Sequence, residues 1–148
     1  MASIAADIVT CPNCGARNRV PRTESGSPQC GRCHNPLPWL VESGDSDFDA
    51  VTTSASLPVL VDVGADWCGP CKIMDPHIEQ LSRDMAGRLK VVKGDSDRAP
   101  ALAQRFQIRG VPTLMLLDHA RVLDRRTGAL TGAALRRWID DVLARAPA

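Results

Sequence analysis

The stretch VDVGADWCGPCK, from Val61 to Lys72, joins an apolar run to a Cys-x-x-Cys pair. The run PVLVDVGA (58–65) is almost continuously apolar and rich in β-branched residues, which is typical of a central strand buried on both faces. Beyond the cysteines, apolar residues recur at steps of four and three and predict an amphipathic helix; they are Met74, Ile78, Leu81 and Met85. We therefore expect a strand, a turn with the cysteines and a helix kinked at Pro76.

The chain from about residue 48 onward alternates strand-like and helix-like patterns. These patterns predict strands over 89–95, 113–118 and 121–127, a short helix over 100–106 and a terminal helix with Thr131 as its N-cap. Such an order indicates an α/β domain, in which helices flank a mixed central β-sheet. We assign this domain to residues 51–148.

Composition and charge narrow the possible functions. The chain has 148 residues, 44% of them hydrophobic, and a formal net charge of +1. This charge favours neither nucleic acid nor a membrane surface as a partner, and no run approaches the roughly 20 apolar residues that span a bilayer. The N-terminal MASIAADIVTCPNC lacks the pattern of a secretory signal. We expect a cytoplasmic protein, in which paired cysteines indicate metal binding or redox catalysis rather than structural disulfides.

The inner pair, Cys68 and Cys71, is placed at the start of the predicted helix. Unpaired backbone N–H groups and a partial positive charge at a helix N-terminus stabilise a thiolate, which is the nucleophilic form of cysteine. The spacing of three residues puts both sulfurs on one side, close enough for a disulfide. Gly69 permits a close turn, and Pro70 is tolerated in the first helical turn. The pattern predicts thiol–disulfide exchange.

Three further residues are candidates for this redox site. Asp62 interrupts an apolar strand, so burial should raise its pKa and let it exchange a proton with Cys71. A structural core carboxylate, or a solvent-facing one, is the alternative interpretation. Lys93 in the neighbouring strand is either a partner of Asp62 or an ordinary surface lysine. Pro112, in VPT at 111–113, predicts an edge position or a cis peptide, shapes a docking groove and blocks metal capture by the thiols.

The outer pairs have the spacing of a four-thiolate zinc ribbon. They are Cys11 with Cys14, and Cys30 with Cys33. Gly15 and Gly31 are expected to supply the tight turns of the two knuckles. Tetrahedral thiolate sites also suit iron, and two disulfides remain an alternative in an oxidising compartment. His34 is not expected to be a ligand, because four thiolates complete the site.

The four outer cysteines define a separate N-terminal module. Residues 1–40 are rich in proline and contain few long apolar residues, so a metal is expected to stabilise their fold. Residues 41–50 are acidic and read as a solvated linker and the start of the main domain. We expect the arginines of the module to form a solvated face; they are Arg17, Arg19, Arg22 and Arg32.

WCGPCK at 67–72 resembles the active-site motif of the thioredoxin family. The resemblance extends over roughly residues 48–146, through VLVDxxAxWCGPCK, IRGVPT and a late TGAL. With its zinc module the chain is similar to the bacterial thioredoxin 2 type. The resemblance implies a thioredoxin fold preceded by a zinc ribbon, with one structural zinc ion and no organic cofactor.

The resemblance also implies roles for individual residues. Cys68 is the attacking cysteine, Cys71 the resolving cysteine, Asp62 the buried acid/base and Pro112 the cis proline. The implied client-docking surface comprises Trp67, Gly69, Pro70, Gly110, Val111, Gly128 and Ala129. Implied partners are disulfide-containing client proteins and a flavin- and NADPH-dependent thioredoxin reductase, and we expect a monomer. A non-enzymatic zinc-ribbon adaptor on a thioredoxin-like scaffold is the main alternative, and an oxidase or isomerase is a third.

Two positions depart from the family pattern. Val63 and Gly64 stand where relatives usually carry aromatic residues, and we expect a void there or a replacement side chain such as Trp39 or Met74. We expect Gly64 to shift the reduction potential or to lower stability without abolishing exchange. The turn DHAR at 118–121 also lacks the usual glycine.

Overall fold

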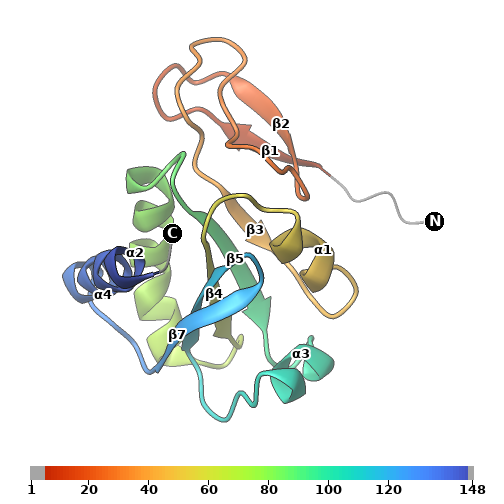
Figure 1. Cartoon of the computed structure of the whole chain (residues 1–148), viewed down its shortest axis with the longest axis vertical. Helices are drawn as coiled ribbons and strands as arrows, with labels where there is room; N and C mark the ends of the chain where they lie inside the picture. Colours follow the sequence, from red (N-terminus) through yellow and green to blue (C-terminus); the bar gives the residue numbers. More distant parts are fainter. Residues whose placement is uncertain (1–5, 147–148) are drawn as a thin grey trace.

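A computed structural model describes residues 6–146 and contains a small and a large β-sheet (Figure 1). The small sheet pairs β1 (Ala6–Thr10) with β2 (Arg17–Pro21) in antiparallel register. The large sheet has five strands in the order β3-β5-β4-β6-β7. These strands are β3 (Leu40–Glu42), β4 (Val59–Gly64), β5 (Lys90–Asp95), β6 (Thr113–Asp118) and β7 (Arg121–Thr127). The predicted bounds 1–40 and 51–148 include residues 1–5 and 147–148, which lie outside the described part of the chain.

The large sheet is mixed, as the sequence predicted. Strands β3, β5 and β4 run parallel to one another, whereas β6 is antiparallel to both β4 and β7. The predicted central strand is β4, which has two strands on either side of it. Its central position explains the continuous apolar run, because helices cover both faces of the sheet and bury the side chains on both sides of this strand.

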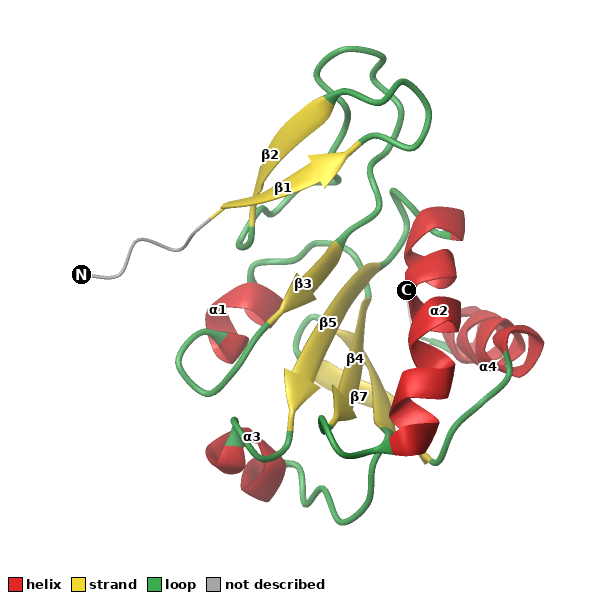
Figure 2. Ribbon diagram, turned by 180° about the vertical axis from the view of Figure 1, so that it is seen from behind, coloured by secondary structure: helices red, strands yellow, loops and turns green. Residues whose placement is uncertain are grey.

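Helices cover the two faces of the sheet in pairs (Figure 2). Helices α2 (Gly69–Asp84) and α4 (Gly132–Arg145) pack on one face, together with Leu60 and Leu114. The other face carries α1 (Phe48–Thr53) and α3 (Pro100–Arg105). The sequence patterns predicted α2, α3 and α4. The predicted N-cap of α4 is confirmed, because Thr131 Oγ1 accepts a hydrogen bond from the Ala134 N–H at 3.2 Å. Among the described residues, no helix is long and apolar enough to cross a membrane.

Alternation along β4 decides which side chains reach the redox pair. Val59, Val61 and Val63 belong to the core cluster under α1 and α3. Leu60 belongs to the cluster under α2 and α4. Because side chains alternate along a strand, Asp62 and Gly64 share the Leu60 face, toward α2. The sheet therefore presents Asp62 to the helix that begins between the two cysteines.

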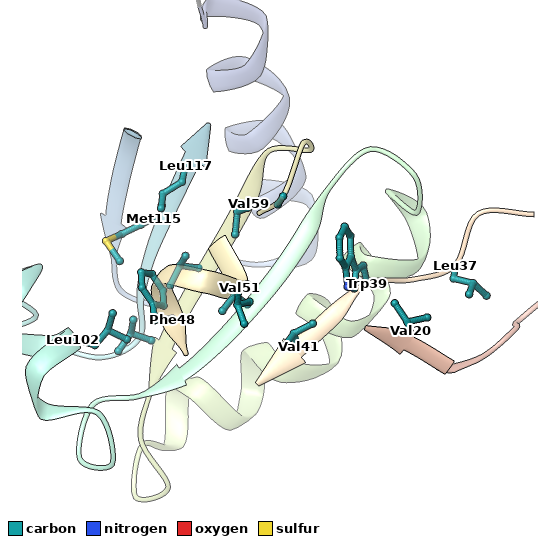
Figure 3. Close-up of a cluster of buried hydrophobic side chains, with 14 of the residues drawn as sticks. Val20, Leu37, Trp39, Val41, Phe48, Val51, Val59, Leu102, Met115 and Leu117 are labelled. Atoms are coloured by element: carbon teal, nitrogen blue, oxygen red, sulfur yellow. The ribbon is translucent and has the colours of Figure 1, made fainter. Parts of the chain in front are cut away.

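The N-terminal module packs directly on the main domain. Val20, Leu37 and Trp39 lie in one continuous buried cluster with Val41 and Phe48 (Figure 3). The buried cysteines Cys11 and Cys30 belong to the same cluster. The module and the main domain therefore share one apolar core.

The segment expected to be a solvated linker over 41–50 is instead integrated into the fold. Its first residues belong to β3, one of the two edge strands of the large sheet, which pairs with β5. Asp45 carboxylate oxygens accept the N–H groups of Ala101 and Leu102 at the start of α3, at 3.1 and 2.8 Å. Asp47 accepts from Arg22 Nη2 at 2.7 Å, so this arginine is not on a purely solvated face. The acidic side chains serve as helix caps and ion-pair partners, roles that local composition does not reveal.

Candidate active site and metal centre

Cys68 and Cys71 form a disulfide at the N-terminus of α2. Cys68 is the N-cap residue, and its Sγ accepts a hydrogen bond from the Cys71 N–H at 3.2 Å. Pro70 occupies the first helical turn, as predicted. The Cys68 sulfur thus lies where the helix N-terminus favours a thiolate.

Asp62 lies buried on the neighbouring strand with 3% of its surface exposed. Its Oδ1 atom has no hydrogen-bond partner among the described residues. Burial raises the pKa of Asp62 to about 6, while the charge of Lys93 lowers it and that of Asp75 adds to the rise. A carboxyl group with this pKa exchanges protons readily near neutral pH.

Lys93 does not form the ion pair with Asp62 that the sequence suggested. The two residues are register partners on β5 and β4, but Lys93 Nζ donates to Asp75 Oδ1 on α2 at 2.8 Å. The Asp62 carboxylate is left without that donor, which keeps its proton affinity high. Asp75 was missed by the sequence argument, although its spacing of four residues from Cys71 places both on one helix face.

Among the predicted docking residues, Val111 contacts the redox pair directly. The Val111–Pro112 peptide bond is cis, and Pro112 lies just before the interior strand β6, not at an edge. Val111 packs against Cys68, Cys71 and Ala65. The Gly128 N–H donates to the Pro112 carbonyl at 2.8 Å, which brings the 128–129 turn beside Pro112.

The remaining predicted docking residues flank the cysteines on the surface. Trp67 is 69% exposed, and its Nε1–H donates to Asp97 Oδ2 at 2.8 Å. Gly69 and Pro70 are exposed, whereas Gly110 is half-buried and its carbonyl accepts from Thr113 Oγ1 at 2.6 Å. An exposed indole held by a hydrogen bond is suited to contact another protein.

The two departures, Val63 and Gly64, lie on opposite faces of the sheet. Val63 is fully buried in the cluster under α1 and α3. The side chain nearest to the space beside Gly64 belongs to Cys71. Neither Trp39 nor Met74, the two side chains expected from the sequence, fills this position. Trp39 precedes β3 at the opposite end of the sheet, and Met74 packs with Leu60. A cavity of about 500 Å³ borders Gly64, Asp62 and Cys71.

The four outer cysteines converge as predicted. Their sulfur atoms all lie within 4.8 Å of one another, with 3.6 Å between Cys11 and Cys33 and 3.5 Å between Cys14 and Cys30. Thiolates bound to one zinc ion at about 2.3 Å stand about 3.8 Å apart in a tetrahedron. The cluster therefore fits a single metal ion.

Hydrogen bonds lower the pKa of the Cys30 thiol in the cluster, whereas the pKa of Cys14 is raised to about 11. A backbone hydrogen bond from Cys33 is the largest contribution that lowers the pKa of the Cys30 thiol to about 6, against the opposing effect of burial. The Arg32 N–H and Asn18 Nδ2 also donate to Cys30 Sγ, at 3.4 and 3.6 Å. Because metal ligation requires thiolates, donors around the sulfur favour the ligating form.

The two knuckles have the same backbone hydrogen bonds. The first cysteine of each donates to a carbonyl five residues on, and its carbonyl accepts from the residue four positions on. That fourth position has a positive φ in both knuckles: 77° at Gly15 and 66° at His34. The prediction for Gly15 is confirmed, but the residue corresponding to it is His34, not Gly31. Gly31 instead donates its N–H to Asn18 Oδ1 at 2.9 Å.

Comparisons with known proteins agree with this geometry. The Thioredoxin family model matches residues 39–141. Thioredoxin C-3 of Corynebacterium nephridii is 37% identical over 139 residues, which cover 92% of this chain and 95% of that protein. Thioredoxin of Haemophilus influenzae is 36% identical over 101 residues, covering 68% and 94% of the two chains. The fold, the disulfide at the helix N-terminus and these matches lead to one conclusion: the chain belongs to the thioredoxin family and is a thioredoxin-type protein-disulfide oxidoreductase.

Proposed function

We propose that the protein is a cytoplasmic protein-disulfide reductase that acts through Cys68 and Cys71. The observation that carries this proposal is the position of the disulfide, between the N-terminus of α2 and the face of β4 that holds Asp62. The helix N-terminus favours a thiolate at Cys68, and the buried carboxyl group supplies a proton acceptor and donor.

The proposed reaction has two steps. The Cys68 thiolate attacks a client disulfide, a mixed disulfide forms, and one client sulfur leaves as a thiolate. Asp62 then takes the proton of Cys71, whose thiolate attacks Cys68 Sγ. The second client sulfur leaves and the Cys68–Cys71 disulfide forms. The client gains two electrons and the protein loses two.

The docking surface proposed for clients surrounds these two sulfurs. The exposed Trp67 ring offers an apolar contact beside the disulfide, and the exposed Gly69 and the Val111–Pro112 turn offer backbone contacts. Gly110, Gly128 and Ala129 complete the surface. Its clients are disulfide-containing proteins, and a flavin- and NADPH-dependent thioredoxin reductase restores the dithiol. We propose that the protein works as a monomer, without nucleic-acid or membrane partners.

One structural zinc ion is proposed for the four outer cysteines. The sulfur spacings and the donors on Cys30 support a tetrahedral thiolate site. Zinc, when bound, supplies no redox chemistry and stabilises the N-terminal module. Lys93 is proposed to act on the redox site through Asp75, because their ion pair fixes the charges that face Asp62.

An insulin turbidity assay with dithiothreitol tests the reductase activity. Wild type is expected to accelerate insulin precipitation, whereas Cys68→Ser is expected to match the dithiothreitol blank. Asp62→Asn is expected to slow the second step while leaving formation of a mixed disulfide intact, and Cys71→Ser should trap that mixed disulfide. Equal rates for wild type and Cys68→Ser would favour the adaptor interpretation.

Metal analysis of the same sample tests the zinc site. We expect one zinc ion per chain, and loss of that ion in Cys14→Ser or Cys30→Ser. Cys68→Ser is the matched control, because it removes a thiol outside the cluster. Iron in the wild-type protein, or two disulfides in place of metal, would contradict the proposed zinc site.

A further inference from the structure

The absence of a side chain at Gly64 leaves the Cys71 sulfur open to a cavity. A Cβ atom at Gly64 would lie 3.3 Å from Cys71 Sγ and 3.5 Å from Cys71 Cβ. Both residues line the cavity of about 500 Å³, while Cys68 is not among the described residues that line it. Cys71 is also the more exposed of the pair, at 7% against 2% for Cys68. The cavity therefore approaches the disulfide from the side of Cys71.

The cavity lies at the carboxyl ends of the three parallel strands. Its walls include Glu42 to Gly44 at the end of β3, Asp62 and Gly64 on β4, and Lys93 to Asp95 on β5. Open α/β sheets bind small ligands at the carboxyl ends of their strands, and ligand cavities typically measure about 300–1,000 Å³. The predicted docking residues of the client surface do not line this cavity. It is a separate approach to the same disulfide.

The charges on the wall suit a small zwitterionic molecule. Three ion pairs border the cavity: Lys93 with Asp75, Arg98 with Asp66, and Arg22 with Asp47. Lys72 adds a cation, and the buried Asp62 presents an Oδ1 atom without a hydrogen-bond partner among the described residues. The cavity thus offers charges of both signs and a proton acceptor beside one sulfur atom.

We propose that this cavity admits low-molecular-weight thiols, of which free cysteine is the simplest, to the sulfur of Cys71. This proposal shares the Cys68–Cys71 disulfide with the proposed function and depends on it in no other way. A cysteine thiolate in the cavity attacks Cys71 Sγ, the Cys68–Cys71 bond breaks, and Cys68 leaves as a thiolate at the helix N-terminus. A second cysteine thiolate attacks the sulfur of the bound cysteine. Cystine leaves, and the Cys71 thiolate takes a proton from Asp62.

This reaction reduces the protein by two electrons and oxidises two cysteines to cystine. The proposed client route begins with attack by Cys68, whereas the cavity route begins with attack on Cys71. The leaving thiolate in the cavity route is the one that the helix N-terminus stabilises, which favours bond cleavage in this direction. The side of attack therefore distinguishes the two routes.

Acid quenching tests the side of attack. The oxidised wild-type protein is mixed with free cysteine, quenched within the first turnover and mapped by mass spectrometry. The cysteine adduct is expected on Cys71. In Gly64→Val the valine side chain covers this sulfur, and the rate of reduction by cysteine is expected to fall by about tenfold or more, since exchange depends on access to the attacked sulfur. An adduct on Cys68 alone, or an unchanged rate in a folded Gly64→Val protein, would overturn the proposal.

Single-cysteine reactivity provides a test that does not depend on exchange. In Cys68→Ser, iodoacetamide is expected to modify Cys71 in the folded protein, and adding Gly64→Val should slow this modification. The matched control is Gly64→Val in a Cys71→Ser chain, where modification of Cys68 is expected to keep its rate. Gly64→Ala replaces valine if the larger side chain lowers the melting temperature into the assay range. Modification of Cys71 only upon unfolding would contradict the proposal.

The two proposals can fail separately. If wild type does not reduce insulin but cysteine still adds to Cys71, the reductase proposal fails and the cavity route stands. If insulin is reduced but Cys71 is inaccessible to both small reagents, the cavity route fails and the reductase proposal stands.

Discussion

The ammonium group of Lys90 lies 4.1 Å from the centre of the Trp39 indole ring. Lys90 is fully buried, and its Nζ donates to the carbonyls of Arg22 and Val51, both at 2.7 Å. Burial lowers the pKa of Lys90 to about 8, and the charge of Arg22 contributes in the same direction. The Lys90 side chain thus joins Arg22 of the N-terminal module to α1 of the main domain.

Lys90→Met is expected to destabilise the whole protein. The substitution keeps an apolar stem but leaves two carbonyls without their donor, so the free energy of unfolding should fall by about 2 kcal/mol. Urea denaturation at pH 7 measures this change, with the exposed Lys72→Met as the matched control. Because the folded pKa lies below the ordinary value of 10.5, the unfolded chain binds the proton more tightly. Wild-type stability relative to Lys90→Met should therefore rise between pH 8 and pH 10. A variant as stable as wild type would contradict this role.

Asp62→Asn is expected to stabilise the oxidised protein increasingly as pH rises. The pKa of Asp62 is about 6 in the folded protein, above the ordinary value for an aspartate. The folded state therefore binds this proton more tightly, and its stabilising effect is lost as pH rises from about 4 through 6. The advantage of the variant over wild type should grow by about 3 kcal/mol between pH 4 and pH 8.

Urea denaturation of both oxidised proteins across that pH range measures the difference. Asp75→Asn is a useful comparison, because it removes a neighbouring charge that raises the pKa of Asp62 but keeps the Asp62 carboxyl group. It should shift the midpoint of the pH dependence downward and keep its shape. A difference between Asp62→Asn and wild type that is constant with pH would show that Asp62 does not titrate in this window.

Metal removal is expected to destabilise both parts of the chain. Cys11 and Cys30 share a buried cluster with Trp39 and Phe48, so loss of the ion should loosen the core under α1. Chelation should lower the melting temperature by about 5–10 °C, since about 1 kcal/mol corresponds to several degrees in a domain of this size. Thermal scans with and without chelator measure this fall in melting temperature. The change in Trp39 fluorescence should occur at the same temperature as the unfolding transition. The Cys68→Ser, Cys71→Ser double variant keeps the outer cluster, so chelation should lower its melting temperature by the same amount. If chelation leaves the melting temperature of the wild-type protein unchanged, the module and the main domain are independent.

Ala120→Gly is expected to stabilise the β6–β7 turn. His119 and Ala120 both have positive φ angles, 49° and 66°. Two-residue hairpin turns of this kind favour glycine, because a side chain clashes in the left-handed region. The gain should be about 0.5–1 kcal/mol after the extra chain entropy of glycine is subtracted. Urea denaturation measures it, and Ala133→Gly, at an exposed helical position, should destabilise instead.

The sequence predicted elements whose signals are local. Three signals each lie within one segment: the apolar run of β4, the spacing of apolar residues along α2 and the N-cap Thr131 of α4. The structure confirms all three. The strand β3 could not be predicted in this way, because three residues carry little pattern and their partner β5 lies far along the chain. The acidic residues after β3 predicted a solvated linker. In the structure, Asp45 instead accepts a hydrogen bond from the Ala101 N–H, and Asp47 binds the guanidinium group of Arg22.

In the candidate site, too, local signals could be read from the sequence, whereas contacts between distant segments could not. Cysteine spacing predicted both clusters, and an acidic residue in an apolar strand predicted the raised pKa of Asp62. The partner of Lys93 depended on how α2 lies against the sheet, which no local pattern determines. The cavity beside Gly64 also required the structure, because a glycine in a sequence does not reveal which atoms it uncovers.

The cysteine knuckles precede the large sheet along the chain, which has a consequence for folding during synthesis. All four thiols of the outer cluster lie within the first 33 residues, before any residue of the large sheet has been made. Domains nearer the N-terminus generally fold first on the ribosome. If the proposed metal ion binds at this stage, it closes the module while β3 still lacks its partner β5, and Val20, Leu37 and Trp39 would then form an apolar surface for the later strands to pack on.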